Sequence, residues 1–351
     1  CIKNPVFTYL SAMILITGGT GLVGSHLLYQ LCKTGENIRA TKRDRSNLDL
    51  IKKVFSYYSD DSDKLFSTIE WVDADLSNVT ELEPAFNGIT KVYHCAAWIN
   101  FNPKYRHKMI ENNVVSTANI VNLSLAYQVK KLCHVSSVAA IGRAGNNKVI
   151  NEETSWLNGP ENSNYAISKY TSELEVWRGI EEGLNAVIVN PSIILGPGEW
   201  KKGSSMIFHQ VWKGMPFYPT GTNGFVDVRD VAKVMIQLME SKIHSERFII
   251  CSESIPFRKT FDYIAEALGK KKAKIKVSSF LNAIGWRLAK IVSIFTGKNP
   301  VLTKESAQAG NNTSIYENDK IKKALNFEFK SIEQSCKDFS KLFLKDYRNN
   351  D

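Results

Sequence analysis

A glycine-rich turn directly after a short apolar run is the feature that most restricts the fold of this chain. Residues 13–17 read Met-Ile-Leu-Ile-Thr, and Gly-Gly-Thr-Gly-Leu-Val-Gly follows over 18–24. The apolar run predicts a buried parallel strand, and residues 22–33 have the periodicity of a helix. Glycines spaced three apart let backbone N–H groups approach a pyrophosphate and let the helix pack on the strand. An ordinary tight turn is the alternative, but the strand-to-helix context favours nucleotide binding.

Strand-like and helix-like segments alternate through the first half of the chain. Further strands are expected at 37–41, 69–73, 92–97, 131–137 and 186–191, and helices at about 47–58, 80–86 and 105–127. Short connections between alternating elements predict a parallel sheet that is covered by helices on both faces. Right-handed crossovers then give a doubly wound order, so the expected fold class is α/β.

The alternation becomes irregular after about residue 191, and this change suggests the domain organisation. The chain has 351 residues, of which 43% are hydrophobic and 23% charged, which is an ordinary globular composition with room for a large core. We expect 1–12 to be an N-terminal extension that precedes the start at Met13. Residues 13–190 would form the nucleotide-binding domain, to which about 225–250 return. Residues 191–351 would mainly form a smaller, partly helical substrate-binding cap over the carboxyl edge of the sheet.

The cysteines, histidines and apolar runs argue against several other classes of protein. Six cysteines have irregular spacing without a C-x-x-C pair, and the six histidines form no closely spaced pair. This pattern predicts neither a metal site nor a disulfide framework, and it fits a reducing, cytoplasmic location. His94 and His134 lie in apolar strands, where we expect hydrogen-bonded structural histidines. No apolar run reaches the length of a membrane span, and residues 1–12 lack the pattern of a signal peptide.

The positive charge is concentrated in one C-terminal segment. The formal net charge is +10, and residues 269–304 contain nine Lys and Arg but no Asp or Glu. A nucleic-acid-binding protein would be basic more uniformly, so we do not expect nucleic acid as a partner. The segment 270–298 is also very apolar. We interpret it mainly as part of the cap, with a substrate-lining wall or peripheral contact with an anionic membrane as alternatives.

The end of the second expected strand bears on cofactor choice. Dinucleotide-binding domains that prefer NAD place an acidic residue there, on the ribose 2′-hydroxyl. This chain has Lys42 followed by Arg43, and cations suit the 2′-phosphate of NADP. Asp44 is the alternative acid if the alignment shifts, and a solvated surface run is the other interpretation. We therefore favour NADP (NADPH) and keep NAD as the alternative.

Three residues further along form a candidate proton-transfer group. Tyr165 and Lys169 are four apart, so they share one face of a helix. A cation beside a phenol is expected to lower its pKa from about 10, which helps proton transfer near neutral pH. Ser137 ends a strand at the sheet edge where α/β folds bind ligands. Ser136 would replace Ser137 if the strand end shifted by one residue.

With these motifs in this order, the sequence resembles the extended, epimerase-like branch of the short-chain dehydrogenase/reductase superfamily. The resemblance spans roughly residues 13–240, with high joint specificity. The matching pieces are the glycine turn, Asp75-Leu76, His94-Cys-Ala-Ala97, Asn112-Asn-Val114, Ser136-Ser137, Tyr165-x-x-x-Lys169 and Asn190-Pro191. The segment 38–44 is most similar to the dihydroflavonol-reductase and 3β-hydroxysteroid-dehydrogenase-like groups. The implied fold is a Rossmann domain with a smaller C-terminal cap.

The resemblance also implies roles for individual residues. Tyr165 would be the general acid/base, Lys169 would bind the nicotinamide ribose and lower the Tyr165 pKa, and Ser137 would hydrogen-bond the substrate oxygen. Besides Tyr165 and Lys169, the expected cofactor contacts are Gly18, Thr20, Gly21, Leu22, Val23, Lys42, Arg43, Asp75, Leu76, Ala96, Ala97, Asn112, Pro191 and Ile193. Asp75 and Leu76 would bind adenine, although a role at a helix start is the alternative. Trp98 either faces the substrate or is simply packed.

Three functions remain open. The first is an NADP-dependent oxidoreductase that interconverts a carbonyl and an alcohol on a moderately apolar molecule. The second is an NAD-dependent nucleotide-sugar epimerase or dehydratase, although residues 138–140 are Val-Ala-Ala, where dehydratases tend to have acids. The third is a non-catalytic dinucleotide sensor. Members of the superfamily often dimerise through a helical face, so a homodimer is one expected state.

Overall fold

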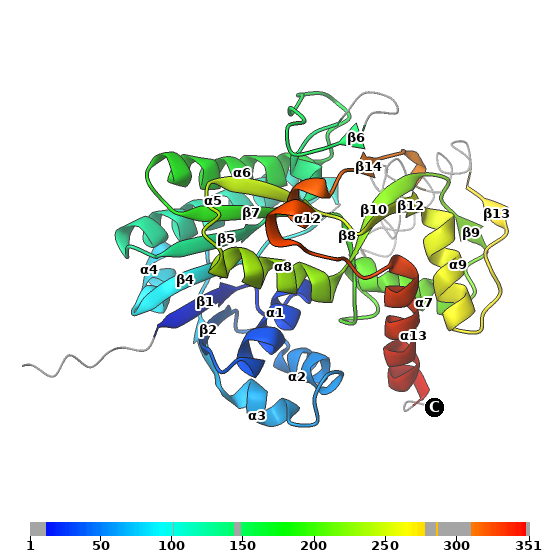
Figure 1. Ribbon diagram of the computed structural model, residues 1–351, viewed down its shortest axis with the longest axis horizontal. Coiled ribbons are helices and arrows are strands. Elements are labelled where there is room, and N and C mark those ends of the chain that lie inside the picture. Colours follow the sequence, from blue (N-terminus) through cyan, green and yellow to red (C-terminus); the bar gives the residue numbers. More distant parts are fainter. Residues whose placement is uncertain (1–11, 101, 144–148, 278–285, 287–309, 349–351) are drawn as a thin grey trace, which may run out of the picture.

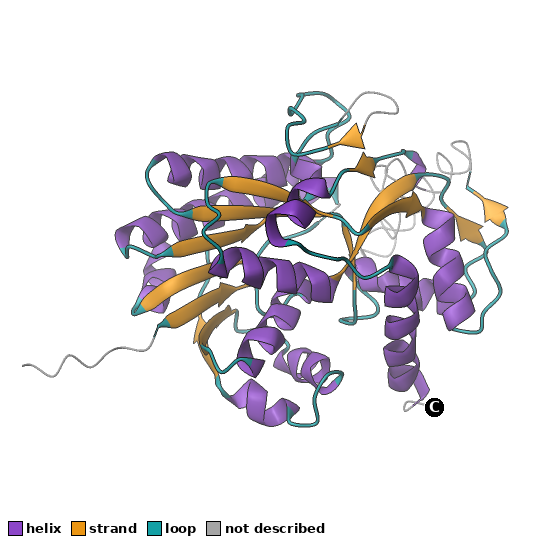
Figure 2. Ribbon diagram, viewed as in Figure 1, coloured by secondary structure: helices purple, strands orange, loops and turns teal. Residues whose placement is uncertain are grey.

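A parallel sheet of seven strands forms the centre of the computed structural model, which describes residues 12–100, 102–143, 149–277, 286 and 310–348 (Figures 1 and 2). Its order is β11-β7-β5-β4-β1-β2-β3. The strands are β1 (Met13–Thr17), β2 (Asn37–Lys42), β3 (Ile69–Asp73), β4 (Ile89–His94), β5 (Lys131–Val135), β7 (Ala186–Pro191) and β11 (Glu246–Ile250). The chain order reverses between β1 and β4, which confirms the doubly wound α/β fold.

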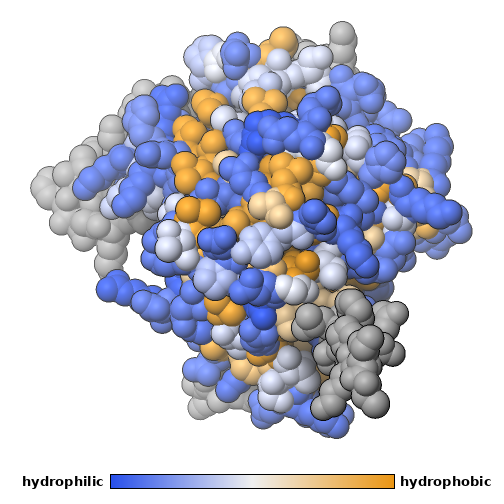
Figure 3. Space-filling model, turned by 90° about the vertical axis from the view of Figure 1, so that its left-hand side faces the viewer, coloured by the Kyte–Doolittle hydropathy of each residue, from blue (hydrophilic) through white to orange (hydrophobic). Residues whose placement is uncertain are grey.

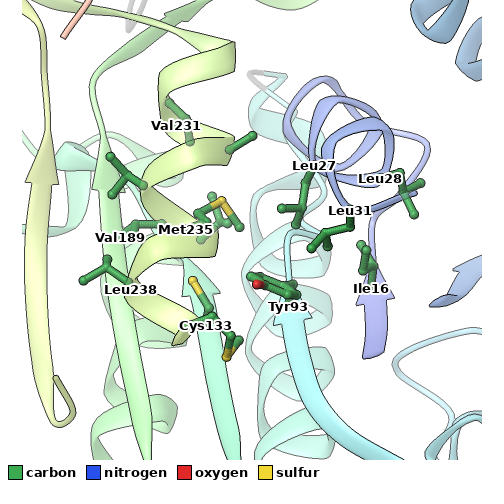
Figure 4. Close-up of a cluster of buried hydrophobic side chains, with 14 of the residues drawn as sticks. Ile16, Leu27, Leu28, Leu31, Tyr93, Cys133, Val189, Val231, Met235 and Leu238 are labelled. Atoms are coloured by element: carbon green, nitrogen blue, oxygen red, sulfur yellow. The ribbon is translucent and has the colours of Figure 1, made fainter. Parts of the chain in front are cut away.

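Helices cover both faces of this sheet because alternate strand residues point in opposite directions. Ile14 and Ile16 of β1 pack with helices α1 (Leu22–Lys33), α2 (Leu48–Ser56) and α8 (Val228–Glu240). Figure 4 shows side chains of α1 and α8 meeting over this face.

Leu15 points to the other face of the sheet. There it packs with helices α5 (Arg106–Ala126) and α6 (Asn164–Glu181) and with the short α4 (Val79–Leu82). Strand β1 is therefore apolar on both sides, as its uninterrupted hydrophobic run predicted.

Several element boundaries differ from those expected. The strand expected at 92–97 is β4 and ends at His94, because the chain leaves the sheet there to pass the glycine turn. The helix expected at 80–86 is α4 followed by a 3₁₀ turn, Glu83–Phe86, since Pro84 cannot donate a hydrogen bond to continue the α-helix. The strand expected at 131–137 ends at Val135. Helix α3 (Ser62–Ser67) was not expected.

The C-terminal part has a core of its own beside the carboxyl ends of the strands. A small sheet of order β12-β10-β8 contains β8 (Ile193–Leu195), β10 (Thr222–Asp227) and β12 (Glu253–Pro256). Helices α7 (Met206–Trp212), α9 (Phe257–Ala267) and α13 (Ile332–Arg348) pack with it. Two-stranded pairs join β6 (Val149–Ile150) to β14 (Ile315–Tyr316) and β9 (Phe217–Tyr218) to β13 (Ile275–Lys276).

The remaining segments of the C-terminal half divide between the two cores. Strand β11 is the edge strand of the main sheet, and helices α8 and α12 (Asp319–Leu325) pack against this sheet. Most of the basic segment 270–298 lies outside the described residues, so its three interpretations stay predictions.

The molecular surface mixes polar and apolar side chains. Figure 3 shows the face at the left of Figure 1, where hydrophobic side chains form a band between hydrophilic ones. None of the described helices combines the length and apolar character that a membrane span requires. The expected homodimer stays a prediction.

A carboxylate near the end of α13 ties this helix to the nucleotide-binding part. Asp346 accepts hydrogen bonds from the hydroxyl of Tyr57 and, at 2.6 Å, from Nε1 of Trp200. Lys53 of α2 lies 3.0 Å from the same oxygen. The contact is mostly shielded, because the side chain of Asp346 is only 9% exposed.

We therefore expect Asp346→Ala to destabilise the protein. The variant leaves two partly buried donors without their acceptor, which costs about 1–3 kcal/mol of the free energy of unfolding. Urea unfolding should show a lower midpoint for Asp346→Ala and an unchanged midpoint for Lys345→Ala, which removes the neighbouring exposed side chain. Equal midpoints for Asp346→Ala and the wild type would show that α13 does not depend on this contact.

Candidate active site

The glycine turn is fixed by close backbone contacts between neighbouring strands. Gly18 has φ of +70°, and a Cβ placed on it would lie 2.5 Å from the backbone nitrogen of Ala96. A Cβ on Gly24 would lie 2.2 Å from the carbonyl oxygen of Gly18. No side chain fits at either position, so glycine is required there by geometry.

The N-terminus of α1 is suited to an anionic group. Gly21 is its N-cap, no side chain among the described residues caps the helix, and its first turn contains no acidic residue. Gly21 N donates to Gly18 O at 3.0 Å, which leaves the following N–H groups of the first turn pointing out of the helix end. Residues 20–23 are half-buried or exposed. This arrangement fits the pyrophosphate of a dinucleotide.

The end of β2 differs from the sequence-based expectation in one respect. Lys42 is the last residue of the strand, and it forms an ion pair with Asp73, its register partner at the end of β3. Arg43 is exposed, and no ion pair of its guanidinium is found within the described residues. Asp44 lies two residues beyond the strand and is exposed. The acid beside the strand end therefore comes from β3, which no local pattern in β2 could have indicated.

Asp75 shapes the turn that follows β3. Its Oδ1 accepts hydrogen bonds from Ser77 N at 2.9 Å and from Ser77 Oγ at 2.7 Å. These bonds, together with the nearby guanidinium of Arg43, hold the pKa of Asp75 below its usual range. The N-cap of α4 is Asn78, three residues later. Arg43 and Asp75 thus face the same region, where β2 and β3 end.

Ser137, Tyr165 and Lys169 come together at the carboxyl edge of the sheet. Ser137 starts a 3₁₀ turn, Val138–Ala140, and its side chain hydrogen-bonds that of Tyr165. Lys169 lies one helical turn after Tyr165 on α6, is 5% exposed, and donates from Nζ to Val135 O at 2.9 Å. The side chains of a strand end and a helix face thus meet as the spacing suggested.

The expected lowering of the Tyr165 pKa is wrong for this structure. Burial raises the pKa of Tyr165, and only the hydrogen bond from Ser137 acts in the opposite direction. Lys169 has no such effect here, because its ammonium is directed to the carbonyl of Val135. Burial lowers the pKa of Lys169 to about 8, although Cys95 and Glu173 oppose the change. Tyr165 is therefore held as a phenol at neutral pH.

In two pairs of adjacent residues, Ser136 and Ser137, and Asn112 and Asn113, the two side chains have different surroundings. Ser136, the alternative to Ser137, donates to buried Glu173 at 2.6 Å instead. Asn113 accepts from Trp98 N at 2.7 Å and donates to Trp98 O at 2.9 Å, so it holds the loop after β4. Asn112, the predicted contact, is only half-buried beside it. Sequence reasoning did not identify Glu173 or Asn113.

The other predicted residues border the same edge. Ala96 and Ala97 follow β4 beside the glycine turn, as the contact with Gly18 shows. Pro191 ends β7, and Ile193 begins β8. The carbonyl of Leu76 accepts from Asn119 Nδ2 at 2.9 Å. The cofactor contacts assigned to these residues stay predictions.

Two buried histidines lie beneath this edge on adjacent strands, with ring centroids 5.1 Å apart. His94 Nδ1 is 2.7 Å from Thr17 Oγ1, and its Nε2 is 3.1 Å from Thr117 Oγ1. Thr117 donates its own proton to Asn113 O, so His94 must carry its proton on Nε2 and accept from Thr17. The expectation of a hydrogen-bonded histidine holds for His94. It is wrong for His134, because neither of its ring nitrogens has a partner within the described part of the chain.

We expect these histidines to make stability fall at acid pH. Burial lowers the pKa of His94 to about 3 and that of His134 well below 6.5. The folded state thus stays neutral while the unfolded chain takes up protons below about pH 6.5. The free energy of unfolding then falls with decreasing pH, by up to about 1.4 kcal/mol per pH unit for each histidine.

Urea unfolding between pH 7 and 4.5 tests this expectation. His134→Leu should flatten the pH dependence and stabilise the protein at the acid end, because it removes two unpartnered polar atoms. His107→Gln, at an exposed site on α5, should leave the slope unchanged. If the free energy of unfolding changed with pH equally in His134→Leu and in the wild type, His134 would not be a source of the acid sensitivity.

Comparison with known proteins connects this geometry to a family. The NAD dependent epimerase/dehydratase family matches residues 14–251. A protein of Synechocystis sp., provisionally named dihydroflavonol 4-reductase, is 27% identical over 332 residues and covers 92% of each chain. Cinnamoyl-CoA reductase 1 of Petunia hybrida is 26% identical, over 70% of this chain and 74% of its own. The solved UDP-glucose 4-epimerase of Thermotoga maritima has a TM-score of 0.75 at 20% identity, covering 95% of this chain and 99% of its own.

Proposed function

The chain belongs to the NAD dependent epimerase/dehydratase family, and we propose that within this family it is an NADPH-dependent reductase. The chain is an NAD(P)-dependent enzyme of the extended short-chain dehydrogenase/reductase type. The proposed reaction interconverts a carbonyl with a secondary or primary alcohol on a moderately apolar small molecule. The observation that carries the proposal is the hydrogen-bonded pair Ser137–Tyr165, with Lys169 one turn away, at the same carboxyl edge of the sheet as the glycine turn.

The protein groups divide the chemistry among them. The cofactor, when bound at the end of α1, supplies the hydride. Tyr165 gives the phenolic proton to the carbonyl oxygen, and its raised pKa keeps that proton in place until reduction begins. Ser137 donates a hydrogen bond to the same oxygen as negative charge develops there. Lys169, whose ammonium is held by the carbonyl of Val135, would bind the nicotinamide ribose and so position the cofactor beside Tyr165.

The preference for NADPH rests on the end of β2. The strand ends at Lys42 and Arg43 follows it, so a lysine stands at the position where NAD-binding domains place an acid for the ribose 2′-hydroxyl. Arg43 is the stronger candidate for the 2′-phosphate, because its planar guanidinium is exposed and can bind phosphate bidentately. Lys42 is already paired with Asp73 and contributes less.

A nucleotide-sugar epimerase or dehydratase is the second candidate, and the likeness to UDP-glucose 4-epimerase is the observation that favours it. At 20% identity this likeness supports the fold alone. Several relatives of higher identity, at 26% and 27%, are named as reductases. The Val-Ala-Ala segment after Ser137 also offers no carboxylate for dehydration. A non-catalytic sensor would not need the Tyr165 and Lys169 pair.

Cofactor titration tests the proposed specificity. We expect NADPH to bind at least about tenfold more tightly than NADH, a difference of about 1.4 kcal/mol. Arg43→Ala should remove most of this preference, Lys42→Ala less of it, and Arg45→Ala, an exposed arginine nearby, none. Fluorescence energy transfer from tryptophan to the nicotinamide measures each affinity. Retained NAD, or tighter binding of NADH, would overturn the NADPH assignment in favour of the epimerase.

Turnover of carbonyl compounds tests the proposed chemistry. A screen of aromatic and alicyclic ketones and aldehydes with NADPH should reveal a substrate. Tyr165→Phe should then lower kcat by roughly 10²–10⁴-fold, the usual worth of a positioned acid, with little change in NADPH affinity. Tyr170→Phe is the control on the same helix, because Tyr170 stacks on Trp156 outside the site. Full activity in Tyr165→Phe would remove this residue from the mechanism.

A further inference from the structure

A buried carboxylate lies behind the catalytic group on the same helix. Glu173 is 2% exposed and lies one helical turn after Lys169 on α6. Burying an isolated carboxylate is very costly, so such a group persists only where donors surround it. Four side chains donate to Glu173, and they come from three different elements besides its own helix.

One carboxylate oxygen ties the helix to the ends of two strands. Oε2 accepts from Ser136 Oγ at 2.6 Å and from Asn190 Nδ2 at 2.8 Å. Asn190, near the end of β7, donates also to the carbonyl oxygen of Ser137 at 3.0 Å. Glu173 therefore holds Ser136 directly and the backbone of Ser137 through Asn190.

The other oxygen is held from the opposite side. Oε1 accepts from Trp177 Nε1 at 3.2 Å and from Arg247 Nη1 of β11 at 3.2 Å. Arg247 also donates from Nε to Glu152 O at 3.0 Å, so its guanidinium is fixed independently. Because donors hold both of its oxygens, the Glu173 carboxylate has one orientation. Ser136 and Asn190, which donate to it at the ends of two strands, are thereby held in place.

From these contacts we propose that Glu173 is a positioning residue, which sets the place of Ser137 relative to Tyr165 and Lys169. The effect of this positioning on catalysis rests on the proposed function. Ser137 and Tyr165 lie on separate elements, a strand end and a helix start, and no covalent constraint holds them in register. The chain Glu173–Asn190–Ser137 supplies that constraint from the same helix that carries Tyr165.

Glu173 also acts on Lys169 through charge. The ionisable groups that surround the carboxylate are Lys169 on its own helix and Arg247 on β11, with Glu152 beyond Arg247. Burial lowers the pKa of Lys169 to about 8, while Cys95 and, after it, the negative charge of Glu173 oppose this change. The other ionisable groups near Lys169 are the buried, neutral His94 and His134. Without the charge of Glu173, Lys169 would lose its proton at lower pH.

Glu173→Gln is the decisive variant because it keeps the side-chain volume. Its amide replaces one acceptor oxygen by a donor, which must face either Arg247 and Trp177 or Ser136 and Asn190. Asn190 cannot turn to accept without losing its bond to Ser137. Glu173→Ala is less informative, because it leaves the guanidinium of Arg247 partly buried without its carboxylate and can prevent folding. Glu181→Gln, the same change at an exposed position of α6, is the control.

We expect Glu173→Gln to fold and bind NADPH but to lower kcat on the order of tenfold or more, with a much smaller change in KM. The alkaline limb of its pH profile should move to lower pH, and Glu181→Gln should match the wild type. A purely structural role would lower the folded fraction without moving the pH profile. A folded Glu173→Gln with the wild-type kcat and pH profile would overturn the proposal.

A readout independent of turnover separates this inference from the proposed function. The pH titration of ¹³Cε-labelled lysine by NMR, assigned with Lys169→Arg, reports Lys169 in the cofactor-free protein. Its midpoint should move to lower pH in Glu173→Gln and stay in place in Glu181→Gln. If no carbonyl compound is turned over, the proposed function fails, yet this shift still supports the link from Glu173 to Lys169. An unchanged midpoint in Glu173→Gln contradicts that link whatever the reaction is.

Discussion

The close approach of Gly18 to the backbone of Ala96 is the contact on which the rest of the site depends. It lies where the strand order reverses between β1 and β4, so the helices that follow these strands leave to opposite faces of the sheet. A side chain at position 18 would push the two strand ends apart. The hydrogen bonds from Cys95 N to Thr17 O and between Thr17 and His94 reinforce the same junction. The turn, the start of α1 and the Ala96–Ala97 segment after β4 are therefore set by one packing constraint.

Burial decides the ionisation of the candidate site more than direct charge pairing does. Tyr165 keeps its proton because the phenolate would be poorly solvated, and Lys169 is made easier to deprotonate for the same reason. The buried carboxylate of Glu173 limits that effect on Lys169. Such an arrangement keeps a neutral acid beside a cation, which suits proton donation to a developing alkoxide. It requires a rigid frame, and the two cores on either side of the strand ends provide one.

Most of the fold could be predicted from local sequence. The strand at 13–17, the helix at 22–33 and the strands at 69–73 and 186–191 occur where their apolar patterns placed them. The predictions were wrong where tertiary packing, and not the local sequence pattern, decided the structure. Strand β4 stops at His94 because the chain must turn past the glycines, although the residues that follow are apolar. His134 is apolar in its surroundings but has no partner for its ring nitrogens in the described part, which no spacing rule reveals.

The sequence by itself determined the α/β order, the glycine turn and the spacing of Tyr165 and Lys169, because these depend on residues close together in the chain. Only the tertiary structure decided that Lys42 pairs with Asp73, that Ser137 and not Ser136 meets Tyr165, and that Glu173 joins α6 to two strand ends. These partners lie on different strands and helices. Which of several equally polar side chains meet across such distances depends on strand register and helix rotation, and both are set by packing of the whole core.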